Sequence, residues 1–198
     1  MCFCYKGVRN VMRGKANIVL GITGSIAAYK AAELTRLMKK KGWGVSVVMT
    51  RAAAKFVGEL TFQTLSRNPV LVDEFERRES WNPAHVSLAD LADLLVIAPC
   101  TANVIAKLAH GLADDALSAT ALACAAPVVI APAMNENMWR HPATVANIEI
   151  LKSRGVIIVN PERGDLACGW EGEGRLAGLE SIMAAAENAL RRKKKNSR

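Results

Sequence analysis

Short, almost wholly apolar segments recur along the chain, and they constrain its fold more than any other feature. The clearest are NIVLGI (17–22), VSVVMT (45–50), DLLVIAP (93–99), APVVIAP (126–132) and VIIVN (156–160). Each has the length of a strand, and none alternates polar with apolar residues as a half-exposed strand does. The pattern predicts strands that are buried on both faces, with PVLVDEF (69–75) as a possible further strand.

The stretches between these segments have helical spacing. After the first strand, Ala27, Ala31, Leu34 and Met38 fall on one stripe, and Ser25 or Thr23 can cap a helix that runs to about residue 41. Further helices are predicted at 52–58, 59–66, 101–110, 114–124, 143–154 and 179–192. Buried strands that alternate with helices are typical of a parallel sheet covered on both faces, so we expect an α/β fold, a three-layer αβα sandwich.

Charge is distributed unevenly along the 198 residues, whose formal net charge is +8. Ten of the 26 basic residues lie in 1–16 and 191–198, which leaves 16 basic against 18 acidic residues between them. We therefore expect one domain at 17–190, a basic N-terminal extension at 1–16 and a basic C-terminal tail at 191–198. The basic residues belong to the ends, so we expect no nucleic-acid partner.

The cysteines and the apolar runs indicate the compartment. Five cysteines form no CxxC pair, which argues against a disulfide framework and against a structural zinc site. No apolar run approaches the ~20 residues that span a bilayer, and the N-terminus lacks the apolar core of a signal peptide. We expect a cytoplasmic protein with reduced thiols, no bound metal and no membrane partner.

The polar and small residues that stand out all follow predicted strands. TGSIA (23–27), TRAA (50–53), PCTAN (99–103), PAMNENMW (132–139) and a glycine-rich segment (161–176) each come directly after one. In open parallel sheets the carboxyl ends of the strands form one edge, and ligands bind in the crevice there. The sequence therefore predicts a ligand site at this edge.

The turn GITGSIAAYK (21–30) places small residues where a strand meets a helix, a common phosphate-binding arrangement. A tight turn that merely needs glycine explains it as well. The dinucleotide fingerprint GxGxxG is absent, and Thr50-Arg51 stands where an NAD site would carry an acid, so a mononucleotide phosphate fits better than NAD.

Several candidate side chains have two interpretations each. His85 is either a surface or capping residue or a catalytic base, and Asn135 is either a helix N-cap or a donor to a carboxylate or flavin. His110 and His141 are expected at helix ends. Cys100 and Cys124 are expected in the core, whereas Cys168 lies in the polar, glycine-rich GDLACGWEGEGRL (164–176).

The motifs occur in an order that resembles the flavin-dependent cysteine decarboxylases, and within that family the phosphopantothenoylcysteine decarboxylases. The resemblance covers about residues 16–190, and PAMNENMW and ACGWEGEGRL are its most specific motifs. It implies a Rossmann-like or flavodoxin-like fold that binds FMN, in a homotrimer or dodecamer with the site between subunits. It also implies a phosphopantothenate–cysteine ligase, as a further domain or as a partner. The implied substrate is 4′-phospho-N-pantothenoylcysteine, converted to 4′-phosphopantetheine in coenzyme A biosynthesis.

The resemblance also implies roles for particular residues. FMN would contact Gly24, Ser25, Ile26, Thr50, Cys100, Thr101, Ala102, Asn103 and Ala133. Asn135, Ala167, Gly169 and Arg175 would bind the substrate. His85 would act as the base in forming a thioaldehyde, which loses CO₂ to give an enethiol, and Cys168 would then donate a proton. The segment PCTAN departs from the residues common in relatives at 100 and 101.

Other functions remain open at this point. A peptidyl-cysteine decarboxylase of the same superfamily would stop at the enethiol and would not need Cys168. A flavin prenyltransferase shares the fold but not the PAMNENMW and ACGWEGEGRL motifs. A non-catalytic regulatory subunit has no need for His85, Asn135 and Cys168 together, and a NAD(P)-binding dehydrogenase domain lacks its fingerprint.

Overall fold

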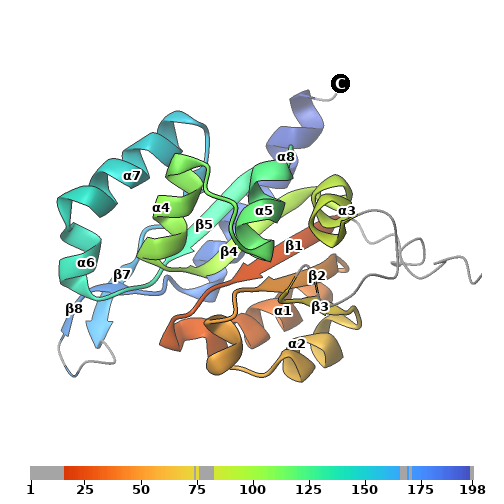
Figure 1. The fold of residues 1–198 in the computed structure, drawn as a ribbon, viewed down its shortest axis with the longest axis horizontal. Coiled ribbons are helices and arrows are strands. Elements are labelled where there is room, and N and C mark those ends of the chain that lie inside the picture. The colour runs from red at the N-terminus through yellow and green to blue at the C-terminus, as the bar shows by residue number, and fades with distance from the viewer. Residues whose placement is uncertain (1–15, 74, 76–82, 166–168, 170, 197–198) are drawn as a thin grey trace, which may run out of the picture.

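The computed structural model describes residues 16–73, 75, 83–165, 169 and 171–196 (Figure 1). The main strands are β1 (Asn17–Ile22), β2 (Gly44–Met49), β3 (Val70–Leu71), β4 (Leu94–Cys100), β5 (Val128–Pro132) and β6 (Ile157–Ile158). The helices are α1 (Lys30–Lys40), α2 (Glu59–Ser66), α3 (Ala84–Leu91), α4 (Ala102–His110), α5 (Ala116–Ala123), α6 (Glu136–Arg140), α7 (Pro142–Ser153) and α8 (Leu179–Asn196). Two 3₁₀ turns, Ile26–Tyr29 and Ala53–Lys55, follow β1 and β2.

The six main strands form one sheet in the order β3-β2-β1-β4-β5-β6, and every pairing is parallel. This is the strand order of a doubly wound Rossmann sheet, in which the order reverses between β1 and β4. Ile18 on β1 lies beside Val45 on one neighbour and Leu94 on the other. The predicted three-layer α/β fold is confirmed.

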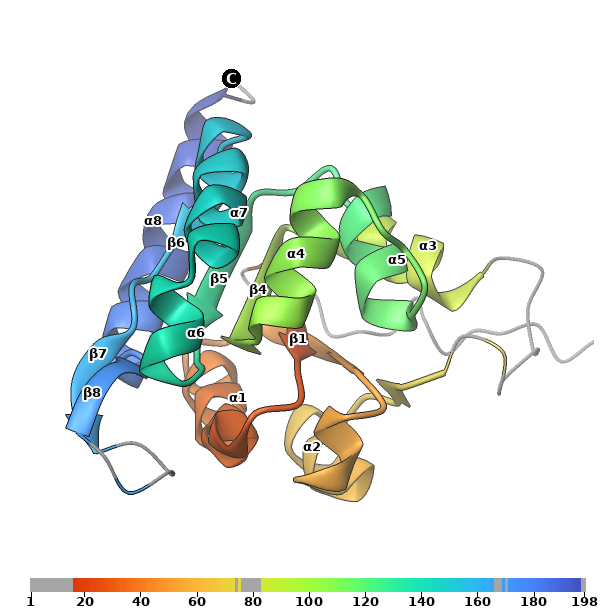
Figure 2. The same cartoon turned by 60° about the vertical axis from the view of Figure 1, so that its left-hand side comes forward.

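Alternate residues of each strand enter different cores because successive side chains point to opposite faces. On β1, Ile18, Leu20 and Ile22 pack on one face, whereas Val19 packs on the other. Helices α1, α2 and α8 cover the first face, and α4, α5 and α7 cover the second (Figures 1 and 2). Strands buried on both sides hold the sheet's carboxyl edge in a fixed position.

Tertiary structure changes several predicted elements. The possible strand 69–75 is reduced to β3, because Asp73 turns the chain by accepting the Phe75 N–H. The predicted helix 52–58 is a single 3₁₀ turn. The terminal helix, expected to end at 192, runs to 196, so most of the basic tail belongs to α8.

Part of the glycine-rich segment 161–176, for which the sequence predicts no strand, forms a two-stranded antiparallel ribbon. β7 (Glu162–Asp165) pairs with β8 (Glu171–Arg175), and Gly164 lies opposite Gly172. The ribbon is separate from the main sheet and projects past α6 (Figure 2). Charged residues alternate with glycines on β8, so no apolar strand pattern predicts this ribbon.

Candidate active site at the carboxyl edge of the sheet

Two adjoining cavities lie at the carboxyl edge, with volumes of about 660 and 480 Å³. We call them the first and the second cavity. Both are lined by Gly24, which follows β1, by Thr101, which follows β4, and by Met138 of α6. Their volumes fall in the range of small-molecule sites, about 300–1,000 Å³. The position agrees with the crevice expected where the strand order reverses.

The turn after β1 is held by a buried threonine and by a close approach to the next strand. The Thr23 hydroxyl donates to the Pro99 carbonyl (2.8 Å) and accepts the Thr101 N–H (3.0 Å), which joins the ends of β1 and β4. A Cβ at Gly24 would lie 2.5 Å from the Ala52 Cβ, so only glycine fits without a shift. Ser25 caps the following 3₁₀ turn by accepting the Ala27 N–H.

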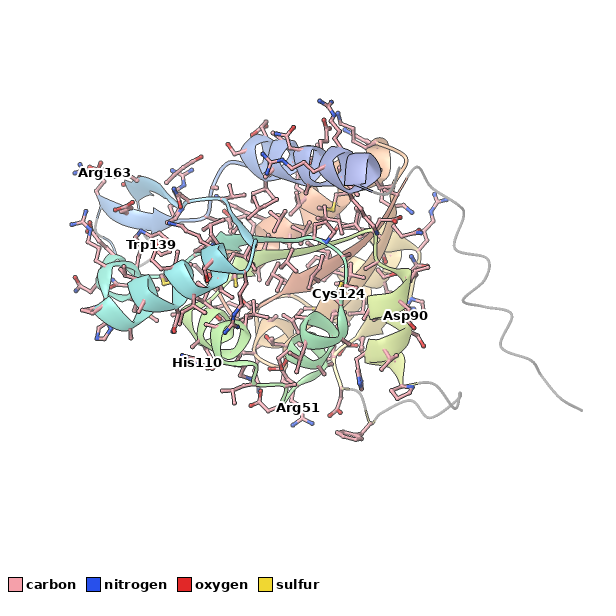
Figure 3. All side chains as sticks on the ribbon, turned by 90° about the horizontal axis from the view of Figure 1, so that it is seen from above. Arg51, Asp90, His110, Cys124, Trp139 and Arg163 are labelled. Carbon is pink, nitrogen blue, oxygen red and sulfur yellow. The ribbon has the colours of Figure 1, made fainter. Side chains whose placement is uncertain are left out.

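The segments that follow β2 and β3 line one side of the second cavity and contribute polar groups to it. Thr50 is buried, and its hydroxyl accepts the Ala53 N–H at 3.1 Å. Arg51 pairs with Asp73, and this hydrogen bond lowers the pKa of the Asp73 carboxyl. Arg51 is itself exposed at the edge of the molecule (Figure 3).

On the opposite side of the second cavity, Lys107 of α4 pairs with Asp114 and Asp115, each at 2.6 Å. Burial alone would raise the pKa of Asp115, but hydrogen bonds from Lys107 and Ser118 outweigh it and lower that pKa. Burial likewise opposes the charge of Lys107, yet the two aspartates raise its pKa. Lys107 and Asp115 are therefore both ionised at neutral pH. Asp115 also forms a capping box with Ser118 at the start of α5.

Asn135 lies in the first cavity, in the turn that follows β5. Its Oδ1 accepts the Asn137 N–H at 2.9 Å, so Asn135 caps α6. The cap uses only the amide oxygen, whereas a bound carboxylate would need the amide N–H donors. The two interpretations of Asn135, a helix cap and a donor to a ligand, therefore do not exclude each other.

The ribbon forms another wall of the first cavity through Asp165, Gly174 and Arg175. The Met134 N–H donates to the Gly174 carbonyl at 3.0 Å, which joins β8 to the turn after β5. The Arg175 guanidinium passes over Gly164, where a Cβ would lie 2.9 Å from its Nη1. The glycine on β7 thus makes room for the arginine.

Most of the predicted site residues meet at these cavities. The first is lined by Gly24, Ser25, Ile26, Thr101, Ala133, Asn135 and Arg175, and the second by Gly24, Thr50, Thr101 and Asn103. Cys100, Ala102 and Gly169 line neither cavity. The Cys100 side chain is buried, and this burial raises the pKa of its thiol. Ala167 and Cys168 lie outside the described residues.

His85 lies apart from both cavities. It is half-buried in the first turn of α3, which packs against α5. The other two histidines have local roles: His110 contacts Asn147 through Nε2 (3.0 Å), and His141 caps α7 by accepting the Ala143 N–H. Figure 3 shows His110 on α4.

Several cavity residues escaped the sequence analysis. The sequence did not single out Tyr29, Lys30 and Asp165 of the first cavity, or Lys107 and Asp115 of the second. Thr23, which is buried and lines neither cavity, was expected only as a helix cap, but it joins the ends of β1 and β4. Lys30 lies in the same motif as Ser25, so that motif could have indicated it. The position of Asp165 depends on the ribbon, which the sequence did not predict.

In the part of the chain that the structure describes, no helix is both long and apolar enough to cross a membrane. In the same residues, no three histidine, cysteine, aspartate or glutamate side chains gather as metal ligands would.

A doubly wound parallel sheet with a ligand cavity at its carboxyl edge defines a nucleotide-binding class of α/β proteins. The chain belongs to the Flavoprotein family, whose model matches residues 8–191. The family predicted from the sequence motifs is thus confirmed.

Named relatives narrow the comparison. The "Coenzyme A biosynthesis bifunctional protein CoaBC" of Bacillus subtilis is 48% identical over 176 residues, which cover 89% of this chain and 43% of that protein. The "Probable phosphopantothenoylcysteine decarboxylase" of Streptococcus mutans is 43% identical over 175 residues, covering 87% of this chain and 98% of the relative. The chain thus spans less than half of the bifunctional relative and nearly all of the second one.

A solved structure has the same fold. It is a mutant PPC decarboxylase complexed with pantothenoylaminoethenethiol, and it matches with a TM-score of 0.79 at 30% identity. The match covers 88% of this chain and 97% of that one.

Proposed function

We propose that this chain is an FMN-dependent decarboxylase of 4′-phospho-N-pantothenoylcysteine, which it converts to 4′-phosphopantetheine and CO₂ in coenzyme A biosynthesis. The observation that carries the proposal is the first cavity, which brings the Ser25 turn, Asn135 and Arg175 together. The decarboxylase from Streptococcus mutans supports it, because this chain matches 98% of that relative's length.

The residues at the cavities fit FMN. Ser25 and Lys30 offer a hydroxyl and an ammonium at the start of a helical segment, where a phosphate is favoured. Ile26, Ala133 and Met138 provide apolar surface for a ring system. Gly24 lines both cavities, and because it lacks a Cβ the turn after β1 approaches Ala52 without a clash. We propose that Gly24, Ser25, Ile26, Thr50, Cys100, Thr101, Ala102, Asn103 and Ala133 surround the cofactor, with Cys100 and Ala102 serving through their backbone.

Asn135 and Arg175 are proposed to bind the substrate. The Asn135 amide would donate a hydrogen bond to the substrate carboxylate, held in place by the cap that its Oδ1 makes. Arg175 supplies the first cavity with a further donor for a substrate that carries a carboxylate and a phosphate. Ala167 and Gly169 would complete the substrate contacts.

The bound flavin would supply a reversible two-electron oxidation of the substrate's CH₂–SH carbon. The resulting thioaldehyde accepts the electrons that the departing carboxylate leaves behind, and the product of CO₂ loss is an enethiolate. His85 would take up the proton released in the oxidation. Cys168 would then protonate the carbon that lost CO₂, as the resemblance implies, and the hydride taken up in the oxidation would return to the sulfur-bearing carbon to give the saturated thiol.

The position of His85 bears on the assembly. It lies on α3, outside the cavities of its own chain, so we propose that it serves the site of a neighbouring subunit. A homotrimer, or a dodecamer of trimers, with sites between subunits would satisfy this requirement. Sedimentation of the purified protein tests it, and a monomer that decarboxylates at full rate would contradict it.

We further propose the organisation and context of the chain. Residues 17–190 would form the decarboxylase domain between the basic segments 1–16 and 191–198. A phosphopantothenate–cysteine ligase would act on the same pathway, as a fused domain or a separate partner. A cytoplasmic location suits the free thiols of Cys100 and Cys124.

Anaerobic mixing with substrate is the decisive experiment. The purified protein should be yellow, and its flavin absorbance should fall and then recover as CO₂ and 4′-phosphopantetheine form. Protein that cannot be reconstituted with FMN would contradict the proposal, as would flavin that bleaches without recovery, since that outcome would indicate an enzyme that stops at the enethiol.

A further inference from the structure

The β7–β8 ribbon depends on its neighbours for its position. Two-stranded ribbons are at best marginally stable alone in water. This ribbon is outside the main sheet, and its β8 strand packs on α6 (Figures 1 and 2). Because Arg175 is on β8 and Asn135 caps α6, the contact between these two elements sets the distance between two proposed substrate-binding residues.

Backbone contacts bring β8 close to α6 and the turn before it. A Cβ at Gly174, whose φ is +143°, would lie 2.2 Å from the Met134 carbonyl oxygen. A Cβ at Gly172 would lie 2.5 Å from the Glu136 Oε2. These two glycines therefore permit the approach, but a glycine only leaves room and does not hold the strand there.

Arg140 supplies a side-chain connection between the two elements. Its Nη2 lies 2.9 Å from the Glu136 Oε1, one turn earlier on α6, and 3.5 Å from the Glu173 Oε2 on β8. The first pair orients the guanidinium along the helix, and the second joins the helix to the ribbon. Glu173 lies between the two glycines that approach α6, so the ion pair acts at the point of closest contact.

We propose that Arg140 is a positioning residue for the substrate site. By pairing with Glu136 and Glu173 it holds β8, and Arg175 with it, at the separation from Asn135 that the substrate requires. This inference rests on the proposed function for its substrate. It assigns Arg140 no contact with substrate or flavin, and it predicts an effect on substrate binding rather than on cofactor binding.

The expected effect is modest because the pairs are largely exposed. Exposed ion pairs contribute little, so Arg140→Glu, which replaces attraction by repulsion from both glutamates, should raise KM about three- to fivefold. The kcat and the flavin content should stay close to the wild-type values. Arg140→Lys should keep KM near the wild-type value, and adding Glu173→Arg to Arg140→Glu should lower KM again.

Lys152→Glu is the matched control. Lys152 is on α7, away from the ribbon, and pairs with Glu149 of the same helix at 2.8 Å. The same charge reversal there should leave KM unchanged. Equal effects of Arg140→Glu and Lys152→Glu would overturn the proposal, as would an unchanged KM in Arg140→Glu or no recovery in the double variant.

Amide hydrogen exchange separates this proposal from the proposed function. The Met134 N–H, bonded to the Gly174 carbonyl, and the amides of β8 should exchange faster in Arg140→Glu than in Lys152→Glu. If the wild-type protein does not turn over the substrate, the proposed function fails, and faster exchange still supports the positioning of the ribbon. Equal exchange in the two variants would refute the positioning itself.

Discussion

Two regions of the molecule form the first cavity, and they are built differently. The turns after β1, β4 and β5 end strands that are buried on both faces, and Thr23 joins two of them through hydrogen bonds at 2.8 and 3.0 Å. Among the residues that the structure describes, the ribbon has no buried apolar side chain, and it contacts α6 and the turn before it through its glycines, the Gly174 carbonyl and the exposed Arg140–Glu173 pair. The first region suits a permanently bound cofactor, and the second suits a substrate that must enter and leave.

The largest expected effect tests the chemistry assigned to the ribbon region. Removing the proposed acid in Cys168→Ser should slow 4′-phosphopantetheine formation by at least about 100-fold, while the enethiol accumulates beside reduced flavin. Product analysis by mass spectrometry with flavin absorbance measures both. Cys124→Ser, which changes a half-buried thiol at the end of α5, is the control and should turn over normally. Normal turnover in Cys168→Ser would remove that residue from the mechanism.

The next effect tests the region formed by the turns after β1, β4 and β5. Gly24→Ser should lower the free energy of unfolding by about 1–3 kcal/mol and reduce FMN content, because its Cβ would meet Ala52 at 2.5 Å. Urea unfolding and flavin absorbance of the purified variant provide the measurements. Gly58→Ser is matched to it, since a Cβ at Gly58 meets nothing within 4 Å and serine is a good cap for α2. Equal flavin loss in both variants would contradict the role of Gly24.

Gly174→Ala tests the position of the ribbon relative to the turn after β5. The new Cβ would lie 2.2 Å from the Met134 carbonyl oxygen, so β8 should move away from the turn that carries Asn135. We expect KM to rise about tenfold while FMN remains bound, which corresponds to about 1.4 kcal/mol of lost substrate binding. Steady-state kinetics and flavin content distinguish this outcome from that of Gly24→Ser. If both glycine variants lost flavin equally, the two regions would not have separate roles.

The smallest effect concerns the ion pairs of the second cavity. The folded-state pKa of Asp115 is lowered, so its contribution to stability is present above the unfolded pKa of about 3.9 and is lost as pH falls below it. Asp115→Asn keeps a capping residue for α5 but removes the charge, so it should lose about 1 kcal/mol at pH 7. Urea unfolding at several pH values should show a flatter dependence below about pH 4 than in the wild type. A slope equal to that of the wild type would contradict this assignment, and the exposed Asp114→Asn should change less.

The sequence predicted the region formed by the turns after β1, β4 and β5 well. NIVLGI and DLLVIAP are apolar throughout because both faces of β1 and β4 are covered, and this local pattern is sufficient to place the turns that follow them at one edge. It also gave both interpretations of Asn135, and the structure shows the cap through Oδ1 in a residue that lines the cavity.

The ribbon was not predictable in the same way. β8 reads EGEGR, with no apolar face and four residues that strands disfavour, two glycines and two glutamates. Its conformation therefore depends on pairing with β7 and packing on α6. The same dependence explains why Asp165 escaped notice as a cavity residue. His85 is the opposite case. The sequence singled it out as a candidate base, but in the fold of a single chain it lies on α3 and lines neither cavity.

The sequence by itself determined the layered sheet, its direction and the edge where a ligand binds, because burial of apolar strands is a local and strong signal. Only the tertiary structure decided which polar residues share a cavity. Contacts such as Thr23 with Pro99, Gly174 with Met134 and Arg140 with Glu173 join segments that are distant along the chain, and no local pattern encodes such distances.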